Sequence, residues 1–419
     1  MQRILSHQLP EHIGSAVTVQ GWVHRRRLLK SVAFLILRDR GGLVQIVVNA
    51  DDQRTLLEQL PEETVVEVTG TATANSAAPL GVEITGPAVR TLSAPAVPPP
   101  FDLFRPLLTA TLPTQLDHAA TSLRHNSRTR ALKAAAAAAA GFRRTLDANG
   151  FTEIFTPKIV ASATESGANV FGLDYFGTRA YLAQSPQFYK QLMVGVFERV
   201  YEVGPVFRAE PHDTARHLAQ YTSLDVELGF IRDHRDVMAV LRDVVAGMTE
   251  AVAERLPGFA VPEVPEEIPA VHFTTALEIA GAPADEPDLA PAHERALGEW
   301  AQREHGSDFV FVTGYPMRKR PFYTHPEPDR PTHSNSFDLL FRGLEMVTGG
   351  QRLHEYADYV SALDGDLTGV ESYVEAFRHG MPPHGGFAIG LERFVARLLG
   401  AQNVREVTAF PRDLHRLTP

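Results

Sequence analysis

The stretch VYEVGPVFRAEPHDTARHLAQYTSLDVELGF, residues 200–230, predicts a long β-hairpin with a polar loop. Residues 200–208 and 222–230 are both strand-like, and in the second strand apolar residues alternate with Asp225 and Glu227. The polar loop contains Arg208, Glu210, His212, Arg216, His217 and Tyr221, so it brings fixed cations beside an aromatic ring. Because guanidinium groups bind phosphate bidentately and a ring can stack on a base, the loop is a candidate clamp for a nucleoside phosphate. A solvated hairpin tip is the alternative.

A second hairpin is predicted in residues 337–352, FDLLFRGLEMVTGGQR. If Arg342 and Gly343 form a two-residue turn, Leu340 faces Glu345, and Asp338 becomes a diagonal neighbour of Glu345 on one face. Two carboxylates placed together without a cation between them would repel. A Mg²⁺ ion that bridges substrate phosphates would account for the pair, since Mg²⁺ uses one or two carboxylates plus phosphate oxygens. Exposed acids on an edge hairpin are the alternative, which fits the apolar neighbours poorly.

A third segment, GGFAIGLERFVARLL at residues 385–399, predicts an apolar strand, a glycine and an amphipathic helix. Gly390 would let a ligand approach the backbone, and the helix N-terminus favours anions. Arg393 stands in the first turns of that helix, where it could meet them.

The first hundred residues predict a different module. Five short strand-like runs, at residues 17–23, 33–38, 43–48, 64–70 and 81–85, suggest a small closed barrel, for which the five-stranded OB-fold is the candidate. The proline-rich residues 93–100 end it. We predict a barrel domain at 1–95, a linker at 96–130 and a catalytic domain at 131–419. Residues 123–149, with seven consecutive alanines, predict a helix, and the Pro-, Ala- and Glu-rich residues 257–291 predict a peripheral insertion.

Composition excludes several classes of protein. The 419 residues contain no cysteine, which excludes disulfide scaffolds, cysteine nucleophiles and thiolate zinc sites. No apolar run has the length of a signal peptide or a membrane span, so we expect a cytoplasmic protein without a membrane partner. Phosphate-loop, G-x-S-x-G and H-E-x-x-H signatures are also absent.

The net charge of -10 is unevenly distributed. Residues 1–100 hold nine Lys/Arg and nine Asp/Glu, so the whole deficit lies in the remainder of the chain. Within residues 22–40, six cations accompany the single acid Asp39. A neutral barrel with a basic strip is the electrostatic footprint of a nucleic-acid site, although the average charge argues against strong non-specific binding.

Together, in this order and behind a barrel, the three segments resemble the class II aminoacyl-tRNA synthetases of the aspartyl branch, in their compact archaeal form. Motif 1 resembles residues 150–158, motif 2 residues 207–218 and motif 3 residues 390–393. The resemblance covers nearly all of the chain. It implies an α+β protein: an N-terminal five-stranded OB-fold β-barrel that binds the anticodon, and a class II catalytic domain with an antiparallel sheet flanked by helices. It also implies a homodimer with Pro157 at the interface.

The resemblance implies ATP-dependent activation of L-aspartate to aspartyl-adenylate and transfer to the 3′ end of tRNA(Asp), with release of AMP and diphosphate. The catalytic residues would be Arg208, Glu345 and Arg393. The ATP site would comprise Arg208, Glu210, Arg216, His217, Leu218, Tyr221, Glu345, Gly390, Leu391, Glu392 and Arg393. Aspartate would be bound by Glu165, Gln187, Lys190, Arg208, Thr348 and Arg352, and Mg²⁺ by Asp338, Glu345 and Thr348. Thr348 replaces a serine usual in the archaeal pattern, and Gln220 stands where relatives often have Glu.

The barrel residues bear on which tRNA is charged. In the family pattern Phe34 stacks on an anticodon base while Gln45 and Glu83 read others, although Phe34 could equally be barrel core. His24 and Pro79 match enzymes of relaxed specificity, so we expect tRNA(Asn) to be charged as well. That product would pass to a tRNA-dependent amidotransferase, and no DNA partner is expected.

Three alternatives remain open. An asparaginyl-tRNA synthetase would have the same fold and lack the lysine at the position of Lys190. A tRNA-binding paralogue without aminoacylation activity would keep the barrel, but it would have no physical reason to retain Arg208, Glu345 and Arg393. An amidating ligase descended from the same catalytic domain would not need the barrel.

Overall fold

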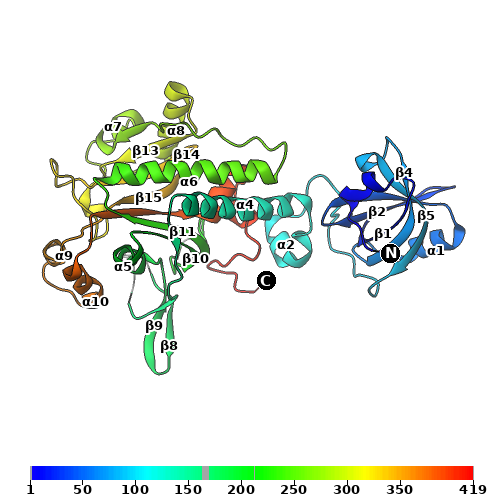
Figure 1. The fold of residues 1–419 in the computed structure, drawn as a ribbon, viewed down its shortest axis with the longest axis horizontal. Helices are drawn as coiled ribbons and strands as arrows, with labels where there is room; N and C mark the ends of the chain where they lie inside the picture. The colour runs from blue at the N-terminus through cyan, green and yellow to red at the C-terminus, as the bar shows by residue number, and fades with distance from the viewer. Residues whose placement is uncertain (1, 163–168, 212, 419) are drawn as a thin grey trace. The chain divides into compact units, whose positions relative to one another are not determined.

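The computed structural model describes residues 2–162, 169–211 and 213–418 (Figure 1). The chain divides into two compact units, Met1–Ser127 and Arg128–Pro419, each described by itself below. The division falls inside the residues predicted as a linker. No helix in the described part of the chain has the length and apolar character needed to cross a membrane.

The first unit is built on a closed five-stranded barrel, as predicted. Its strands are β1 (Ala16–Leu28), β2 (Ala33–Asp39), β3 (Gly42–Val48), β4 (Val65–Ala74) and β5 (Val82–Thr91), hydrogen-bonded in the order β1-β2-β3-β5-β4. Inward-facing aliphatic residues from all five strands form its core. Strand β1 continues through Arg25, Arg26 and Arg27, so the basic strip extends a strand of the barrel. Helix α1 (Asp51–Gln59) and the short helices α2 (Leu112–Asp117) and α3 (Ala119–Ser122) complete the unit.

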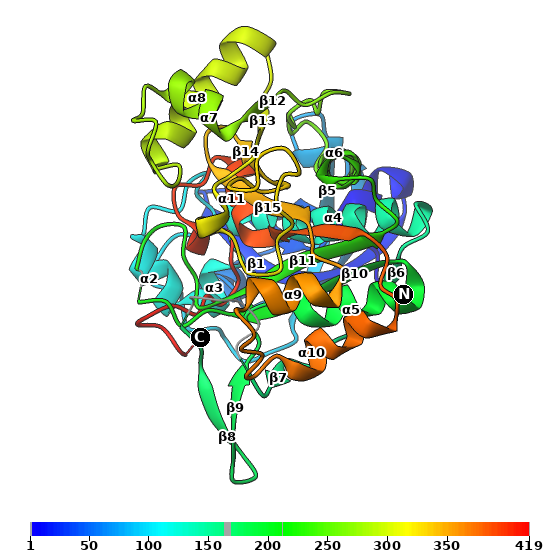
Figure 2. The ribbon, with the colours of Figure 1, turned by 90° about the vertical axis from the view of Figure 1, so that its left-hand side faces the viewer.

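The second unit is built on an eight-stranded sheet in the order β12-β13-β14-β15-β16-β11-β10-β6. The strands are β6 (Thr152–Glu153), β10 (Arg199–Phe207), β11 (Gln220–Gly229), β12 (Ala270–His272), β13 (Phe309–Thr313), β14 (Ser336–Phe341), β15 (Glu345–Gln351) and β16 (His384–Gly390). All neighbours are antiparallel except β6 with β10 and β12 with β13. With the barrel, this sheet and its helices confirm the predicted α+β class. A separate three-stranded sheet, β7 (Ile159–Val160), β9 (Thr178–Leu182) and β8 (Gly172–Tyr175), ends in a protruding hairpin (Figure 2).

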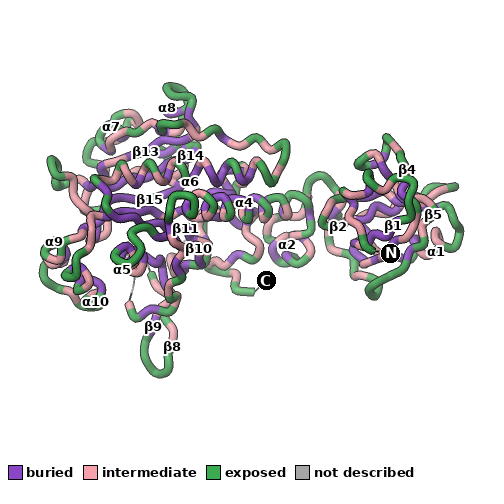
Figure 3. Tube along the Cα trace, viewed as in Figure 1, coloured by how far each residue is buried: buried purple, intermediate pink, exposed green. Residues whose placement is uncertain are grey.

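Two long helices, α4 (Asn126–Ala148) and α6 (His234–Arg255), lie side by side on the sheet (Figures 1 and 2). The alanine run of α4 is helical as predicted, and its inner face is buried at Ala131, Ala134 and Ala138. The helices cross at Gly141 and Gly247, where a Cβ on Gly141 would lie 2.3 Å from the carbonyl oxygen of Gly247. Only glycine permits this approach, so the helices lie close to each other over the sheet, whose central strands are mostly buried (Figure 3).

Helix α5 (Gln187–Phe197) packs against β10 and β11, and α11 (Leu391–Leu399) follows β16 directly. The predicted insertion is partly regular structure. It includes β12 and α7 (Phe273–Ala280), and α8 (Pro291–His305) begins at its last residue. Together with β13 and β14 these elements enclose a hydrophobic cluster around Phe273, Leu297 and Val312. Helices α9 (Tyr356–Ala362) and α10 (Glu371–Glu375) bury a second cluster rich in tyrosine and phenylalanine.

Candidate functional site

A cavity of about 350 Å³ opens over the middle of the large sheet. It brings together fourteen of the residues predicted from sequence: Gln187, Lys190, Arg208, Glu210, Arg216, His217, Leu218, Tyr221, Glu345, Thr348, Arg352, Gly390, Glu392 and Arg393. Asp338 and Leu391 are buried beside it, and Glu165 lies outside the described residues. The cavity also contains polar residues that sequence reasoning missed, among them Ser223, Arg320, Tyr323 and Thr324.

The sheet register joins the first and third sequence segments. Strand β11 lies between β10 and β16, with Tyr221 opposite Val206 and Ser223 opposite Gly390. The Glu392 carboxylate accepts the backbone N–H of Thr222 at 3.0 Å, which fixes the start of α11 against the hairpin. A Cβ on Gly390 would make only ordinary contacts, so the protein itself does not require glycine there. A larger side chain at this position would instead occupy the cavity.

The polar loop of the hairpin is anchored by the C-terminal segment. The Arg405 guanidinium, which is buried, donates to the Thr214 carbonyl at 3.1 Å and pairs with Asp213 at 2.8 Å. Backbone hydrogen bonds join Val404 to Ala215 and Ala219 to Arg412. The loop residues Arg216 and His217 are therefore held at the cavity by residues almost two hundred positions later in the chain.

The inner half of the same hairpin presents a cation beside an aromatic ring. The Arg208 guanidinium lies 5.7 Å from the centre of the Tyr221 ring, a cation–π distance. Both side chains line the cavity. A flat ring and a planar guanidinium in this arrangement can receive a purine and a phosphate, respectively.

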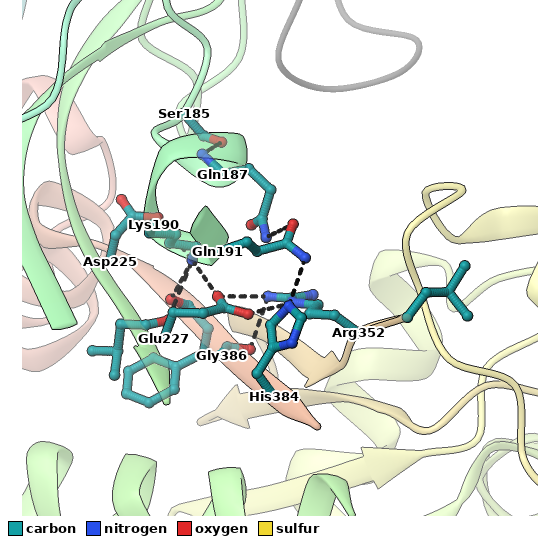
Figure 4. A network of polar contacts seen from close by, with 12 residues as sticks. Ser185, Gln187, Lys190, Gln191, Asp225, Glu227, Arg352, His384 and Gly386 are labelled. Carbon is teal, nitrogen blue, oxygen red and sulfur yellow. Dashed lines mark hydrogen bonds and ion pairs between the residues drawn. The ribbon is translucent and has the colours of Figure 1, made fainter. Parts of the chain in front are cut away.

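At the inner end of the cavity, two cations meet two buried carboxylates (Figure 4). The Lys190 ammonium donates to Asp225 at 3.1 Å and to the carbonyl oxygens of Val226 and Phe387 at 3.3 and 3.1 Å. Its three N–H groups are thus occupied by protein acceptors. Arg352 Nε donates to Glu227 at 3.0 Å, and the other Glu227 oxygen lies 3.4 Å from Lys190.

Asp225 and Glu227 alternate with apolar residues, a pattern typical of a half-buried strand, yet both side chains are buried. They are 2% and 0% exposed, because helices cover both faces of this sheet. Burial alone would raise the pKa of Glu227, but Arg352 and Lys190 outweigh it and hold that pKa below its ordinary value. The inner end is therefore a closed charge network. Within the described residues, no hydrogen bond is made by Arg352 Nη1, which can still bind a ligand anion.

The predicted carboxylate hairpin has the expected turn, but its register shifts by one residue beyond the first pair. Phe341 and Leu344 close a two-residue turn, with positive φ at Arg342 (49°) and Gly343 (71°), and Leu340 faces Glu345. A bulge follows, so that Asp338 pairs with Thr348.

Sequence reasoning missed the cation at this hairpin. Arg320 Nη2 donates to Asp338 at 3.0 Å, and both side chains are buried. Even so, burial and the charge of Asp338 raise the pKa of Glu345 to about 7. Negative charge is thus still under-compensated, and the oxygen donors of Asp338, Glu345 and Thr348 fit the hard ligand set of Mg²⁺. No group of three or more His, Cys, Asp or Glu residues that could hold a metal occurs among the described residues, so phosphate oxygens would have to complete the shell.

In the barrel, Gln45 and Glu83 are direct partners on neighbouring strands. Gln45 Nε2 donates to Glu83 at 3.0 Å, and Asn75 donates to the same carboxylate at 2.7 Å. Phe34 is only partly buried and lies outside the barrel's buried core, contrary to the alternative that it is a core residue. Pro79 is exposed at a turn.

His24 lies within the basic strip. Its Nδ1 is 3.3 Å from Arg38, whose guanidinium forms a bidentate pair with Glu63. Burial, and then the charge of Arg38, lower the pKa of His24 to about 4, so the ring is neutral at pH 7.

Two family models match the chain. Residues 111–414 match the model described as tRNA synthetases class II (D, K and N), and residues 17–92 match an OB-fold nucleic acid binding domain. The chain is 47% identical to a Thermus thermophilus protein named aspartate–tRNA(Asp/Asn) ligase over 100% of both chains, and 46% identical to a protein of the same name from Deinococcus radiodurans over 100% of this chain and 99% of the other. The structure of asparaginyl-tRNA synthetase from Pyrococcus horikoshii with asparaginyl-adenylate superposes with a TM-score of 0.92 at 29% identity, over 100% of both chains.

Proposed function

The chain belongs to the class II tRNA synthetases of the D, K and N group, and on that premise we propose that it activates L-aspartate with ATP and transfers it to tRNA. The observation that carries the proposal is the cavity. At one end of the cavity, Arg352 and the positive charge of Lys190 can attract a carboxylate. At the other end, Arg208 and Tyr221 can bind a nucleotide. An amino acid with a carboxylate on its side chain as well as on its backbone fits this distribution of charge better than one with a neutral side chain.

At the nucleotide end, Arg208 meets the α-phosphate, Tyr221 and Arg393 enclose the adenine, and Arg216 and His217 bind the outer phosphates. Glu210 contacts the adenosine. The other residues predicted to bind ATP contact it as their places in the family motifs imply. Mg²⁺ held by Asp338, Glu345 and Thr348 would neutralise phosphate charge. The substrate α-carboxylate attacks the α-phosphorus in line, diphosphate leaves, and the terminal tRNA hydroxyl then displaces AMP from the acyl carbon.

At the amino-acid end, Arg352 binds the side-chain carboxylate through the guanidinium nitrogen that makes no hydrogen bond within the described protein. Lys190 contributes its charge, and Gln187 and Glu165 bind the ammonium group. Asparagine would leave this cationic end uncompensated, which is the physical basis for rejecting it. Exchange of pyrophosphate into ATP, supported by aspartate and not by asparagine, is the expected result.

The opposite preference in the same assay would make the enzyme an asparaginyl-tRNA synthetase, the second candidate favoured by the structural match. The absence of exchange with either amino acid would leave a tRNA-binding protein without aminoacylation activity.

The barrel selects the tRNA, and we expect it to accept both tRNA(Asp) and tRNA(Asn). Support comes from His24 and Pro79 and from the names of the two relatives above. Charging the two purified tRNAs side by side with radiolabelled aspartate tests this directly. No transfer to tRNA(Asn) would refute relaxed specificity, whereas a variant carrying both His24→Trp and Pro79→Lys should lose tRNA(Asn) selectively. The misacylated product would be the substrate of a tRNA-dependent amidotransferase in the cytoplasm.

The active form is proposed to be a homodimer. Four apolar side chains are exposed near the motif 1 segment and the adjoining ends of α5 and β11: Phe155 (83%), Val196 (63%), Phe197 (46%) and Phe230 (70%). Single exposed apolar residues are ordinary, but a group of this kind marks an interaction surface. Light scattering after size exclusion should give twice the 46.0 kDa chain mass, and Phe155→Asp should halve it.

A further inference from the structure

Behind the amino-acid end of the cavity lies a chain of buried polar side chains, His384, Gln191 and Gln187 (Figure 4). Gln191 Nε2 lies 3.0 Å from His384 Nε2, and Gln187 Nε2 lies 2.9 Å from Gln191 Oε1. All three residues are buried, and Gln187 alone lines the cavity. Each amide donates only through its nitrogen and accepts only through its oxygen, so fixing one link fixes the direction of the whole chain.

The protonation of His384 sets the direction of these hydrogen bonds. His384 Nδ1 lies 2.9 Å from the carbonyl oxygen of Pro382, which can only accept, so this nitrogen must carry a proton. Burial lowers the pKa of His384 to about 4, and the ring is therefore neutral at pH 7. Its Nε2 then has no proton and acts as an acceptor.

The acceptor at His384 Nε2 orients the next amide. Gln191 must present its NH₂ group to that nitrogen, which turns its oxygen the other way. This oxygen accepts from Gln187 Nε2 and from the Tyr373 hydroxyl, both at 2.9 Å. With its amide nitrogen held at Gln191, Gln187 keeps its oxygen and one N–H, and no described residue donates to that oxygen.

We infer that His384 and Gln191 are positioning residues that hold the Gln187 amide nitrogen at Gln191 and so leave the Gln187 oxygen available to the substrate. The inference rests on the proposed function, because aspartate carries N–H donors only on its α-ammonium group. An oxygen at this point accepts from that group, whereas an amide nitrogen would repel it. The polar chain thus discriminates the ammonium end of the substrate from its carboxylate end.

Histidine NMR tests the direction without any change to the pocket. In protein labelled with ¹⁵N-histidine, the resonances of His384 are identified by their loss in the His384→Asn variant. We expect the neutral tautomer with the proton on Nδ1 at pH 7. A proton on Nε2 would require the Gln191 oxygen to face His384, which would reverse every later link and overturn the inference.

Steady-state kinetics test the consequence. Gln191→Met keeps the approximate side-chain volume and removes the acceptor that holds Gln187. The KM for aspartate in pyrophosphate exchange should rise about tenfold, the loss of one hydrogen bond to a charged group, while the KM for ATP stays unchanged. Gln302→Met, on the exposed face of α8, is the matched control and should change neither constant.

The outcomes separate the two proposals. If Gln191→Met leaves the aspartate KM unchanged, or raises both constants equally, the positioning role is wrong. If the wild-type protein shows no aspartate-dependent exchange, the proposed function is wrong, while the tautomer of His384 still reports on the orientation of the chain.

Discussion

Replacing Glu227 by glutamine should destabilise the second unit more than any other single change of one carboxylate to an amide in the large sheet. The side chain is fully buried, accepts from Arg352 at both oxygens, and pairs with Lys190 through one of them. Glutamine keeps the size and removes the charge, so two buried cations would share the single remaining carboxylate of Asp225.

The magnitude follows from the partners that remain. Removing one member of a buried ion pair costs about 3–5 kcal/mol, because its partner is left uncompensated in a poorly polarisable interior. Lys190 keeps the carboxylate of Asp225 at 3.1 Å, whereas Arg352 keeps no carboxylate and bonds only neutral oxygens, the carbonyl of Gly386 and the new amide. We therefore expect a loss of about 3 kcal/mol in the free energy of unfolding at pH 7, at the lower end of that range.

The pKa of Glu227 determines how the stability difference between wild type and Glu227→Gln changes with pH. The pKa of Glu227 is lowered in the folded protein, below the ordinary value of 4.5. The carboxylate therefore stabilises the fold at pH values above about 4.5, and this contribution is lost as the pH falls through the lower folded-state pKa. The stability difference between wild type and Glu227→Gln should be largest near neutrality and shrink in acid.

The two tryptophans provide the assay. Trp22 lies in the barrel and Trp300 in α8, so in a Trp22→Phe background fluorescence reports urea unfolding of the second unit alone. Glu254→Gln is the control, since it removes one member of an exposed ion pair with Arg144 and should leave the unfolding midpoint unchanged. Equal stability of Glu227→Gln and wild type at pH 7, or a difference that persists undiminished in acid, would refute the reasoning.

Three further predictions follow from the site and its support. Because the pKa of Glu345 is about 7, adding Mg²⁺ to the ATP complex at pH 7 should release more protons from the wild-type protein, measured with a pH indicator, than from Glu345→Gln, in which ATP alone loses protons. Arg405→Ala should raise the KM for ATP about tenfold through loss of its charged hydrogen bonds, and an unchanged value in exchange assays would contradict the anchoring of the loop. Gly141→Val should lower the free energy of unfolding by about 1–3 kcal/mol by overpacking against Gly247, whereas Ala136→Val, on the exposed face of α4, should change it little in the same urea titration.

Local sequence was sufficient wherever one segment determines its own conformation. The turn at Arg342 and Gly343 was predictable because two residues with positive φ close a hairpin only in a few ways. The barrel strands and the alanine-rich helix were predictable for the same reason, since strand alternation and helix propensity act over neighbouring residues.

The buried charge network of Lys190, Asp225, Glu227 and Arg352 could not be predicted from local sequence. Lys190 comes from a helix 35 residues before Asp225, and Arg352 from a loop 125 residues after Glu227. Nothing in the alternation of β11 shows that both faces of the strand are covered, so its acids looked exposed. Arg320 follows a short 3-10 helix in a proline-rich connection without periodicity, and only the folded chain shows its contact with Asp338.

The anchoring of the hairpin loop by Arg405 and Arg412 has a consequence for the order of synthesis. The residues that contact Asp213, Thr214 and Ala219 leave the ribosome almost two hundred residues after them. A nascent chain can pair its early strands, yet the loop that carries Arg216 and His217 stays unsupported until residues 404–412 have been synthesised. Prematurely terminated chains should therefore bind tRNA through the barrel while lacking an ordered phosphate clamp, and they would neither consume ATP nor release a charged product.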